Sequence, residues 1–204
     1  MVNQLKQHKR HSTTKTSTKK HHSSNKKNIM TNEQTSGVGT TEVEMTNPPA
    51  SMAAPAQITL RPFSPEDQAW IMQVTKEEMG PVFQESYGYD LNLDNVVQYV
   101  RSAQTRMVTV NDQLAGYVSI VIDDGGKMNI GSLVLSLPHK RRGYGTRIMK
   151  LLEQEARGMG LMELEAFVQS SNQPSINFLK KLGFKEVPSM QTQTIVMVKN
   201  LQTD

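Results

Sequence analysis

The sequence predicts an α/β domain with a mixed, mostly antiparallel twisted sheet of six to seven strands, flanked by about four helices. Two turn-forming sequences, Asn111-Asp112-Gln113 and Asp123–Gly126, separate segments of strand-like composition, which indicates antiparallel hairpins. Apolar residues then recur at helical spacing in Thr146–Arg157. Helical and strand-like segments alternate from there onward, so the predicted order is β-α-α-β-β-β-α-β-α-β.

The first predicted elements are one strand and two helices. Ile58–Arg61 alternates like a short strand. Ser64-Pro65-Glu66-Asp67 combines an N-cap residue, a proline at the first helical position and acids in the first turn. This helix is expected to end near Met79, where Gly80-Pro81 would stop it. A second helix is expected over Asn92–Ser102.

The remaining elements follow from alternation, helical spacing and turn residues. A Gly-containing loop, Lys140–Gly145, precedes the Thr146–Arg157 helix, and a short helix opens at Pro174 and ends at Gly183. The predicted strands are Arg106–Val110, Leu114–Ile122, Lys127–Leu137, Leu161–Val168 and Gln193–Lys199.

The chain is expected to divide into a disordered tail, residues 1–56, and a folded domain, residues 57–204. The tail lacks periodicity and has little to bury. A composition change at Met30 leaves open whether translation starts there or at Met1. Residues 1–29 hold eight basic residues and no acid, so the totals of 23 and 19 leave 15 basic against 19 acidic residues elsewhere. Binding of nucleic acid is therefore expected through the tail alone, if at all.

Composition narrows the classes of function. The chain contains no Cys, which excludes disulfides, thiolate zinc sites and a Cys nucleophile. It has no apolar run of membrane-spanning length and no signal peptide, so we expect a cytoplasmic protein without a membrane partner. The histidines of the tail lack fixed ligand geometry, and no metal site is expected.

The segment with the most chemical information is the loop Lys140–Gly145. Gly143 and Gly145 let the backbone approach a ligand closely, and the first turn of the following helix presents unpaired N–H groups. The helix dipole favours an anion there, and Lys140, Arg141 and Arg142 add positive charge. The pattern indicates a pyrophosphate cradle, although tight packing of strand on helix would use the same glycines.

Two further features accompany this loop. Asn172 follows the next predicted strand, and the short helix after it ends in Lys181-Leu-Gly-Phe184. With Lys140-Arg-Arg-Gly-Tyr-Gly145, the chain here resembles the GNAT family of N-acetyltransferases, with the Asn at the spacing usual for members that acetylate protein N-termini. The resemblance covers about Ile58–Lys199 and is strongest over Leu133–Phe184.

The resemblance implies acetyl-CoA as cosubstrate, with its pantetheine arm between the fourth and fifth strands. Backbone groups of Leu133, Val134 and Leu135 would bind the arm, and the Leu135 backbone is our candidate contact for the thioester oxygen. Asn172 would bind the arm as well, or cap the helix that follows it. The pyrophosphate would be held by the loop residues Lys140, Arg141, Arg142, Gly143, Tyr144, Gly145 and Thr146.

The chain departs from the family at two positions. The first loop residue is Lys140, where the family usually has Arg or Gln. Many members carry a Tyr in the last helix that protonates the leaving thiolate, and this chain has Leu179 at matching spacing. Either Ser170, Ser171 or water donates instead, or the thiolate leaves unaided, or the domain binds CoA without catalysis.

The position at which family members often carry the general base also differs in this chain. Phe167 stands at one position where members carry an acid, and Glu165 and Glu163 precede it on the same face of the strand. Glu165 is our candidate base. For His139 we expect three roles in order of preference: an ordinary surface residue, then a contact with the phosphate, then the base. The segment Tyr87-Gly88-Tyr89 is expected either to touch the acceptor or to form an ordinary loop.

The predicted function is N-acetyl transfer by direct attack of a primary amine on acetyl-CoA, without a covalent enzyme intermediate. The acceptor would be a protein N-terminus, a lysine or a small amine. The alternative is a non-catalytic module that binds acyl-CoA and either reports CoA status or docks a partner. Dimers are common in the family, so a homodimer is also considered.

Overall fold

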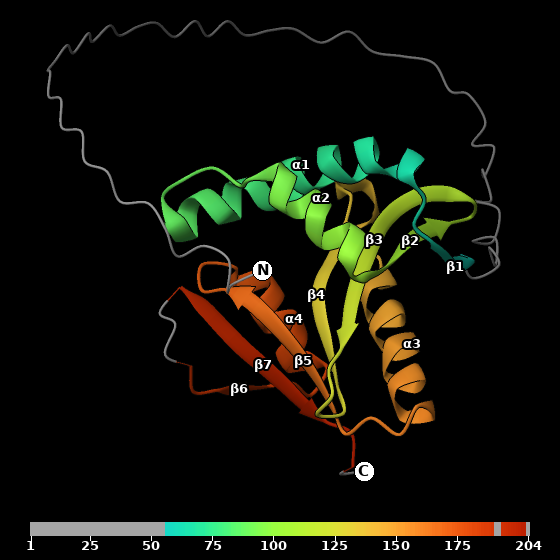
Figure 1. The fold of residues 1–204 in the computed structure, drawn as a ribbon, viewed down its shortest axis with the longest axis vertical. Helices are drawn as coiled ribbons and strands as arrows, with labels where there is room; N and C mark the ends of the chain where they lie inside the picture. The colour runs from blue at the N-terminus through green and yellow to red at the C-terminus, as the bar shows by residue number, and fades with distance from the viewer. Residues whose placement is uncertain (1–55, 190–192, 203–204) are drawn as a thin grey trace, which may run out of the picture. The chain divides into compact units, whose positions relative to one another are not determined.

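The computed structural model describes residues 56–189 and 193–202. The disorder expected for the tail, and the question of Met30, lie outside these residues. Within the described ranges, seven strands form one sheet in the order β1-β2-β3-β4-β5-β7-β6, and only β4 and β5 are parallel neighbours there (Figure 1). The elements are β1 (Ile58–Pro62), α1 (Gln68–Tyr87), α2 (Leu93–Ser102), β2 (Gln104–Val110), β3 (Gln113–Ile122), β4 (Lys127–Leu135), α3 (Tyr144–Gly158), β5 (Glu163–Gln169), α4 (Gln173–Lys181), β6 (Lys185–Val187) and β7 (Thr194–Asn200). The predicted fold class is confirmed.

Two apolar cores lie on opposite faces of the sheet. The larger core packs α3 and α4 against side chains such as Leu164 and Ala166 of β5. The smaller core packs α1 and α2 against Met107, Tyr117 and Val134. The strands β2, β3 and β4 therefore divide their side chains between the two cores, which fixes their register.

The end of α1 corrects the expectation at Gly80-Pro81. The helix continues through both residues to Tyr87 and ends at Gly88, whose φ is 77°. Interior proline costs about 3 kcal/mol because it removes one helical hydrogen bond. Contacts beyond it offset that cost: Phe83 is buried, and the Tyr87 hydroxyl lies 2.8 Å from Thr194 Oγ1. Tertiary packing therefore overrides the local stop signal.

Most other boundaries shift by one or two residues, and two differences have a clear local cause or change the order of elements. β4 ends at Leu135 instead of Leu137, because the next residues form a short 3₁₀ turn, η3 (Leu137–His139), that contains Pro138. The three-residue strand β6 is absent from the predicted order and pairs with β7 at the edge of the sheet. The β2–β3 hairpin is confirmed, with positive φ at Asn111 and Asp112 as a two-residue primed turn requires.

A buried carboxylate anchors the start of α1. Asp67 accepts hydrogen bonds from both terminal nitrogens of Arg61, at 2.8 and 2.6 Å, and from the Ser64 backbone N–H at 2.9 Å. The guanidinium is the main cause that lowers the pKa of Asp67 to about 2, while burial opposes it. The pair ties β1 to the first turn that leads into α1.

Asp67→Asn is expected to lower stability at neutral pH. A depressed Asp pKa contributes stability that is present above the ordinary value of 3.8 and is lost as the pH falls through about 2. Because the Arg61 side chain is 41% exposed, we expect a loss of about 1–2 kcal/mol near pH 7. Urea unfolding at pH 7 and at pH 2–3 measures it, and an equal difference at both pH values would contradict this assignment.

Candidate active site

The parallel strands β4 and β5 separate part of the way along the sheet. They pair from Lys127–Glu163 to Ile130–Ala166, whereas β4 continues to Leu135 and β5 to Gln169. Figure 1 shows the two strands together at one end and apart at the other. The two strands between which the resemblance places the pantetheine arm therefore diverge.

A β-bulge lies where the strands separate. Ser132 of β4 is opposite Ser119 of β3, but Ile130 is opposite the next residue, Ile120, which leaves Gly131 as the extra residue. A bulge bends its strand and increases the local twist. From Gly131 to Leu135 the β5 side of β4 therefore has no strand partner, which leaves backbone donors and acceptors for an extended ligand.

The loop between β4 and α3 has the backbone of an anion site. Arg141 and Gly143 have φ of 59° and 80°, and Gly143 is the N-cap of α3. Within the described residues, the backbone N–H groups of residues 141–146 donate no hydrogen bond; the first helical bond runs from Arg147 N to Gly143 O. Free N–H groups at a helix N-terminus, in a loop with left-handed residues, favour a phosphate.

The cations of this loop differ in their surroundings. Lys140 Nζ forms an ion pair with Glu78 of α1, whose side chain is only 12% exposed. Arg141 and Arg142 are exposed and form no ion pair within the described residues. The charge available to an anion therefore comes from the two arginines, while Lys140 attaches the loop to α1. Glu78 was not predicted, because it stands 62 residues from its partner.

Asn172 and Leu179 occupy α4, which follows β5. Asn172 is the N-cap, and its Oδ1 accepts from the Ser175 N–H at 3.2 Å. Its Nδ2 donates no hydrogen bond within the described part of the chain, so the amide retains a donor for a ligand. Leu179 is buried in the larger core. The capping role is confirmed, and no proton donor stands at the Leu179 position.

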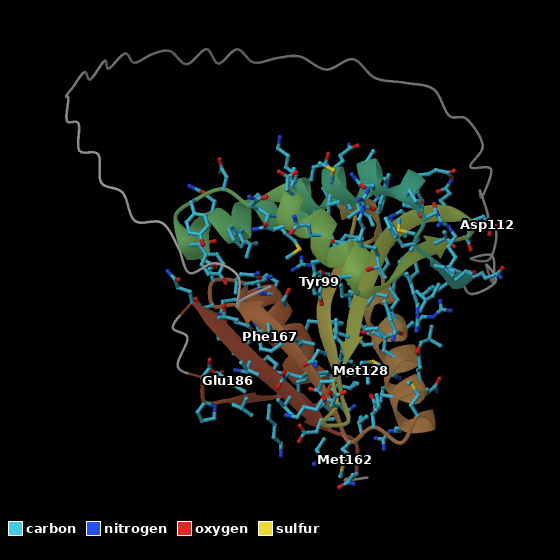
Figure 2. The ribbon with its side chains drawn as sticks, in the orientation of Figure 1. Tyr99, Asp112, Met128, Met162, Phe167 and Glu186 are labelled. Atoms are coloured by element: carbon cyan, nitrogen blue, oxygen red, sulfur yellow. The ribbon has the colours of Figure 1, made fainter. Side chains whose placement is uncertain are left out.

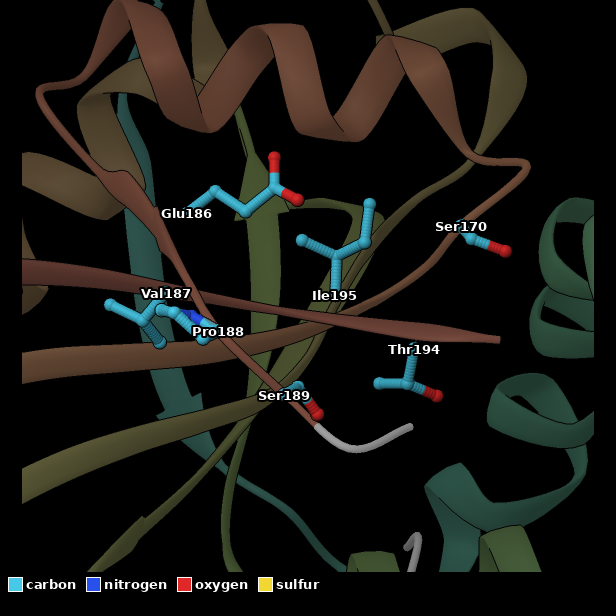
Figure 3. A pocket seen from close by; sticks show the side chains of 7 residues that line it. All are labelled: Ser170, Glu186, Val187, Pro188, Ser189, Thr194 and Ile195. Atoms are coloured by element: carbon cyan, nitrogen blue, oxygen red, sulfur yellow. The ribbon is translucent and has the colours of Figure 1, made fainter. Parts of the chain in front are cut away.

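The remaining candidate donors and bases lie apart. Ser171 Oγ is 2.6 Å from Ser86 Oγ of α1, and Ser170 lines a surface hollow of about 570 Å³ beside β6 and β7 (Figure 3). His139 Nδ1 is 2.9 Å from Ser136 Oγ. These contacts place Ser171 against α1 and give His139 a local partner beside the loop.

Glu165 lies at the closed end of the divergence. It pairs with Asn129 across β4 and β5, and its carboxylate is 3.9 Å from Lys127 Nζ, which is closer to Glu163 at 3.0 Å. Its neighbours Leu164 and Ala166 enter the core with α3 and α4, so Glu165 and Phe167 face the α1 and α2 side. Phe167 is 41% exposed on this face.

The end of α1 and the loop that follows it contribute three aromatic rings. Phe83, Tyr87 and Tyr89 form a cluster with ring centroids 4.4–6.0 Å apart. Tyr87 is fixed to Thr194 of β7, whereas Tyr89 is 46% exposed. The predicted segment is therefore a packed cluster with one exposed ring, and its contact with an acceptor stays a prediction.

Among residues 56–189 and 193–202, no group of three or more His, Asp or Glu side chains could hold a metal ion. Within the same ranges, no helix has the length and apolarity needed to cross a bilayer.

The sheet order, the divergent strands and the anion loop define the fold class of the acetyltransferases. The model of the acetyltransferase (GNAT) family matches residues 70–184, and the chain belongs to that family. Transfer of an acetyl group is the general reaction of the class. No curated protein sequence matches the chain.

Solved structures show the same fold. The PaiA N-acetyltransferase of Thermoplasma acidophilum, in complex with coenzyme A, has a TM-score of 0.58 at 18% identity, over 71% of this chain and 99% of that chain. The ribosomal-protein-S18-alanine N-acetyltransferase of Escherichia coli has a TM-score of 0.57 at 14% identity, over 72% of this chain and 96% of that chain. YncA of Salmonella typhimurium, a putative acetyltransferase in complex with its cofactor acetyl-CoA, has a TM-score of 0.53 at 20% identity, over 72% of this chain and 95% of that chain.

Proposed function

We propose that the chain is an acetyl-CoA-dependent N-acetyltransferase that moves the acetyl group to a primary amine by direct attack. The free N–H groups of the β4–α3 loop carry this proposal, because a diphosphate satisfies donors that the protein leaves unpaired. Family membership and the structures of relatives with CoA or acetyl-CoA support it.

The unpaired edge of β4 orients the pantetheine arm. Leu135 lies next to the loop, and Leu133 lies nearer to the point where the strands meet. An arm whose diphosphate sits on the loop runs from Leu135 past Val134 toward Leu133, with its reacting end deepest. This order favours the N–H of Leu133 over that of Leu135 for the thioester oxygen, and Leu135 stays a contact of the arm. Asn172 supplies Nδ2 from the N-cap of α4, in the turn that follows β5.

The acceptor enters from the face covered by α1 and α2. That face carries Glu165 and the exposed rings of Phe167 and Tyr89. The acceptor classes are a protein N-terminus, a lysine side chain or a small amine. A panel of free-N-terminal peptides, Nα-blocked lysine peptides and polyamines, assayed by CoA release, identifies the class; no release above background with any of them would contradict the transferase proposal.

A non-catalytic module that binds acyl-CoA is the second candidate, and buried Leu179 favours it because that position holds no proton donor. Such a module binds acetyl-CoA tightly, but CoA is released no faster than by uncatalysed cleavage of acetyl-CoA in solution. Calorimetry together with the same amine panel separates the two functions.

Gly143→Glu is expected to abolish acetyl-CoA binding in calorimetry with the full chain. A side chain at this position enters open space at the N-terminus of α3 and brings a negative charge to the anion site. Gly160→Glu is the matched control, because Gly160 also has positive φ and an open surrounding but lies beyond the other end of α3. Equal losses of affinity in both variants would assign the effect to backbone strain.

Glu165→Gln tests the candidate base. If Glu165 takes the proton of the incoming ammonium, the variant lowers kcat about 100-fold or more, with little change in acetyl-CoA affinity. Glu163→Gln removes the carboxylate closer to Lys127 and serves as the control. The measurement is steady-state kinetics with an amine found in the panel; equal rates in the parent and Glu165→Gln would exclude this residue as the base.

A further inference from the structure

A tyrosine from α2 lies at the point where β4 and β5 separate. A Cβ atom on Gly131 would overlap the hydroxyl oxygen and the ring carbon Cζ of Tyr99, so the phenol rests directly on this glycine. Gly131 is the bulge residue and follows Ile130, the last residue of β4 that pairs with β5. Figure 2 shows Tyr99 below α2 and beside β4. The glycine is therefore what admits the phenol to this place.

The hydroxyl of Tyr99 makes no hydrogen bond within the described residues, although Tyr99 interacts electrostatically with the nearby Tyr117. Among residues 56–189 and 193–202, no group forms a hydrogen bond with its Oη. The neighbouring Tyr117 differs, because it is fully buried and its hydroxyl lies 2.7 Å from Thr75 Oγ1. Burial raises the pKa of Tyr99, so its phenol keeps its proton at neutral pH and can act as a donor.

The position of this free donor coincides with the reacting end of the proposed arm. Gly131 remains exposed despite the phenol, so the space beside Tyr99 is open to a ligand. The sulfur of an arm that runs inward from Leu135 would come to this gap between the strands. On the α4 face stands Leu179, which cannot donate a proton, and on the α2 face stands Tyr99.

Resting on the proposed function, we infer that Tyr99 is a catalytic residue that donates the proton taken up by the CoA thiolate. The amine nitrogen attacks the thioester carbon and the N–C bond forms. The C–S bond then breaks and its electron pair goes to sulfur. The Tyr99 hydroxyl gives its proton to that sulfur, and its oxygen takes a proton from the acetylated nitrogen. The products are the acetamide and the CoA thiol, with Tyr99 restored.

The test measures the bound thiol and needs no acceptor. CoA and desulfo-CoA, which lacks the sulfur, are titrated by calorimetry into the full chain and its Tyr99→Phe variant between about pH 6 and pH 10, around a thiol pKa of about 8.5. The affinity ratio of the two ligands reports the sulfur alone. A hydrogen bond from Tyr99 stabilises the thiolate, so at high pH the parent is expected to show a ratio about tenfold larger than the variant.

Tyr117→Phe is the matched control, since it removes a phenolic hydroxyl from the same interface between helix and sheet. It is expected to lower Tm through loss of the Thr75 hydrogen bond and to leave the affinity ratio unchanged. Equal ratios in the parent and Tyr99→Phe, or an equal loss in both variants, would overturn the role of Tyr99 while acetyl-CoA binding stands. Failure of the parent to bind either ligand would overturn the proposed function and this inference together.

Discussion

The incomplete pairing of β4 with β5 is the constraint on which the candidate site depends. These are the only parallel neighbours among the described strands, and their ladder ends at Ile130–Ala166. The bulge at Gly131 bends β4 away at that point. The sheet remains one unit because β3 continues to pair with β4 up to Leu135, and β7 pairs with β5 up to Gln169. Two antiparallel ladders, one of which contains the bulge at Gly131, therefore flank the opening.

Parallel direction also brings two helix N-termini to the open end of this gap. The carboxyl ends of parallel strands lie at one edge, and the helices that follow them begin there. α3 begins after Gly143, with free N–H groups, and α4 begins after Asn172, whose Oδ1 caps the helix and whose Nδ2 remains available. One topological feature therefore provides both a slot for an extended arm and donors for an anion.

The sequence predicted the parts of this site that depend on local conformation. Gly143 was singled out because a glycine before a helix lets the backbone approach a ligand, and Asn172 through the resemblance and as an N-cap; the structure shows the left-handed φ of the first and the capping by the second. The predicted end of α1 was wrong because it depends on long-range contacts. Pro81 is a local stop signal, but the burial of Phe83 and the contact of Tyr87 with a distant strand override it. Propensity alone could not weigh those contacts.

The same limit applies to the side chains from α1 and α2 that reach the site. Glu78 of α1 forms an ion pair with Lys140, and Tyr99 of α2 rests on Gly131. Neither helix contains a sequence motif that would predict such a contact. A long-range contact of this kind follows from how a helix packs, and packing is set by the whole apolar core. Only Gly131 left a signal in the sequence, since an isolated glycine within a strand often marks a bulge or a close approach.

The resemblance places a tyrosine of the last helix where this chain has Leu179. Leu179 packs in the larger core, where a phenol would need a partner for its hydroxyl. A sulfur placed between diverging strands does not require its proton from that side. The opposite layer offers Tyr99, whose approach depends on the absence of a side chain at Gly131. The bulge that separates the strands therefore also makes room for a proton donor, and the larger core can keep an apolar residue at position 179 without loss of the chemistry.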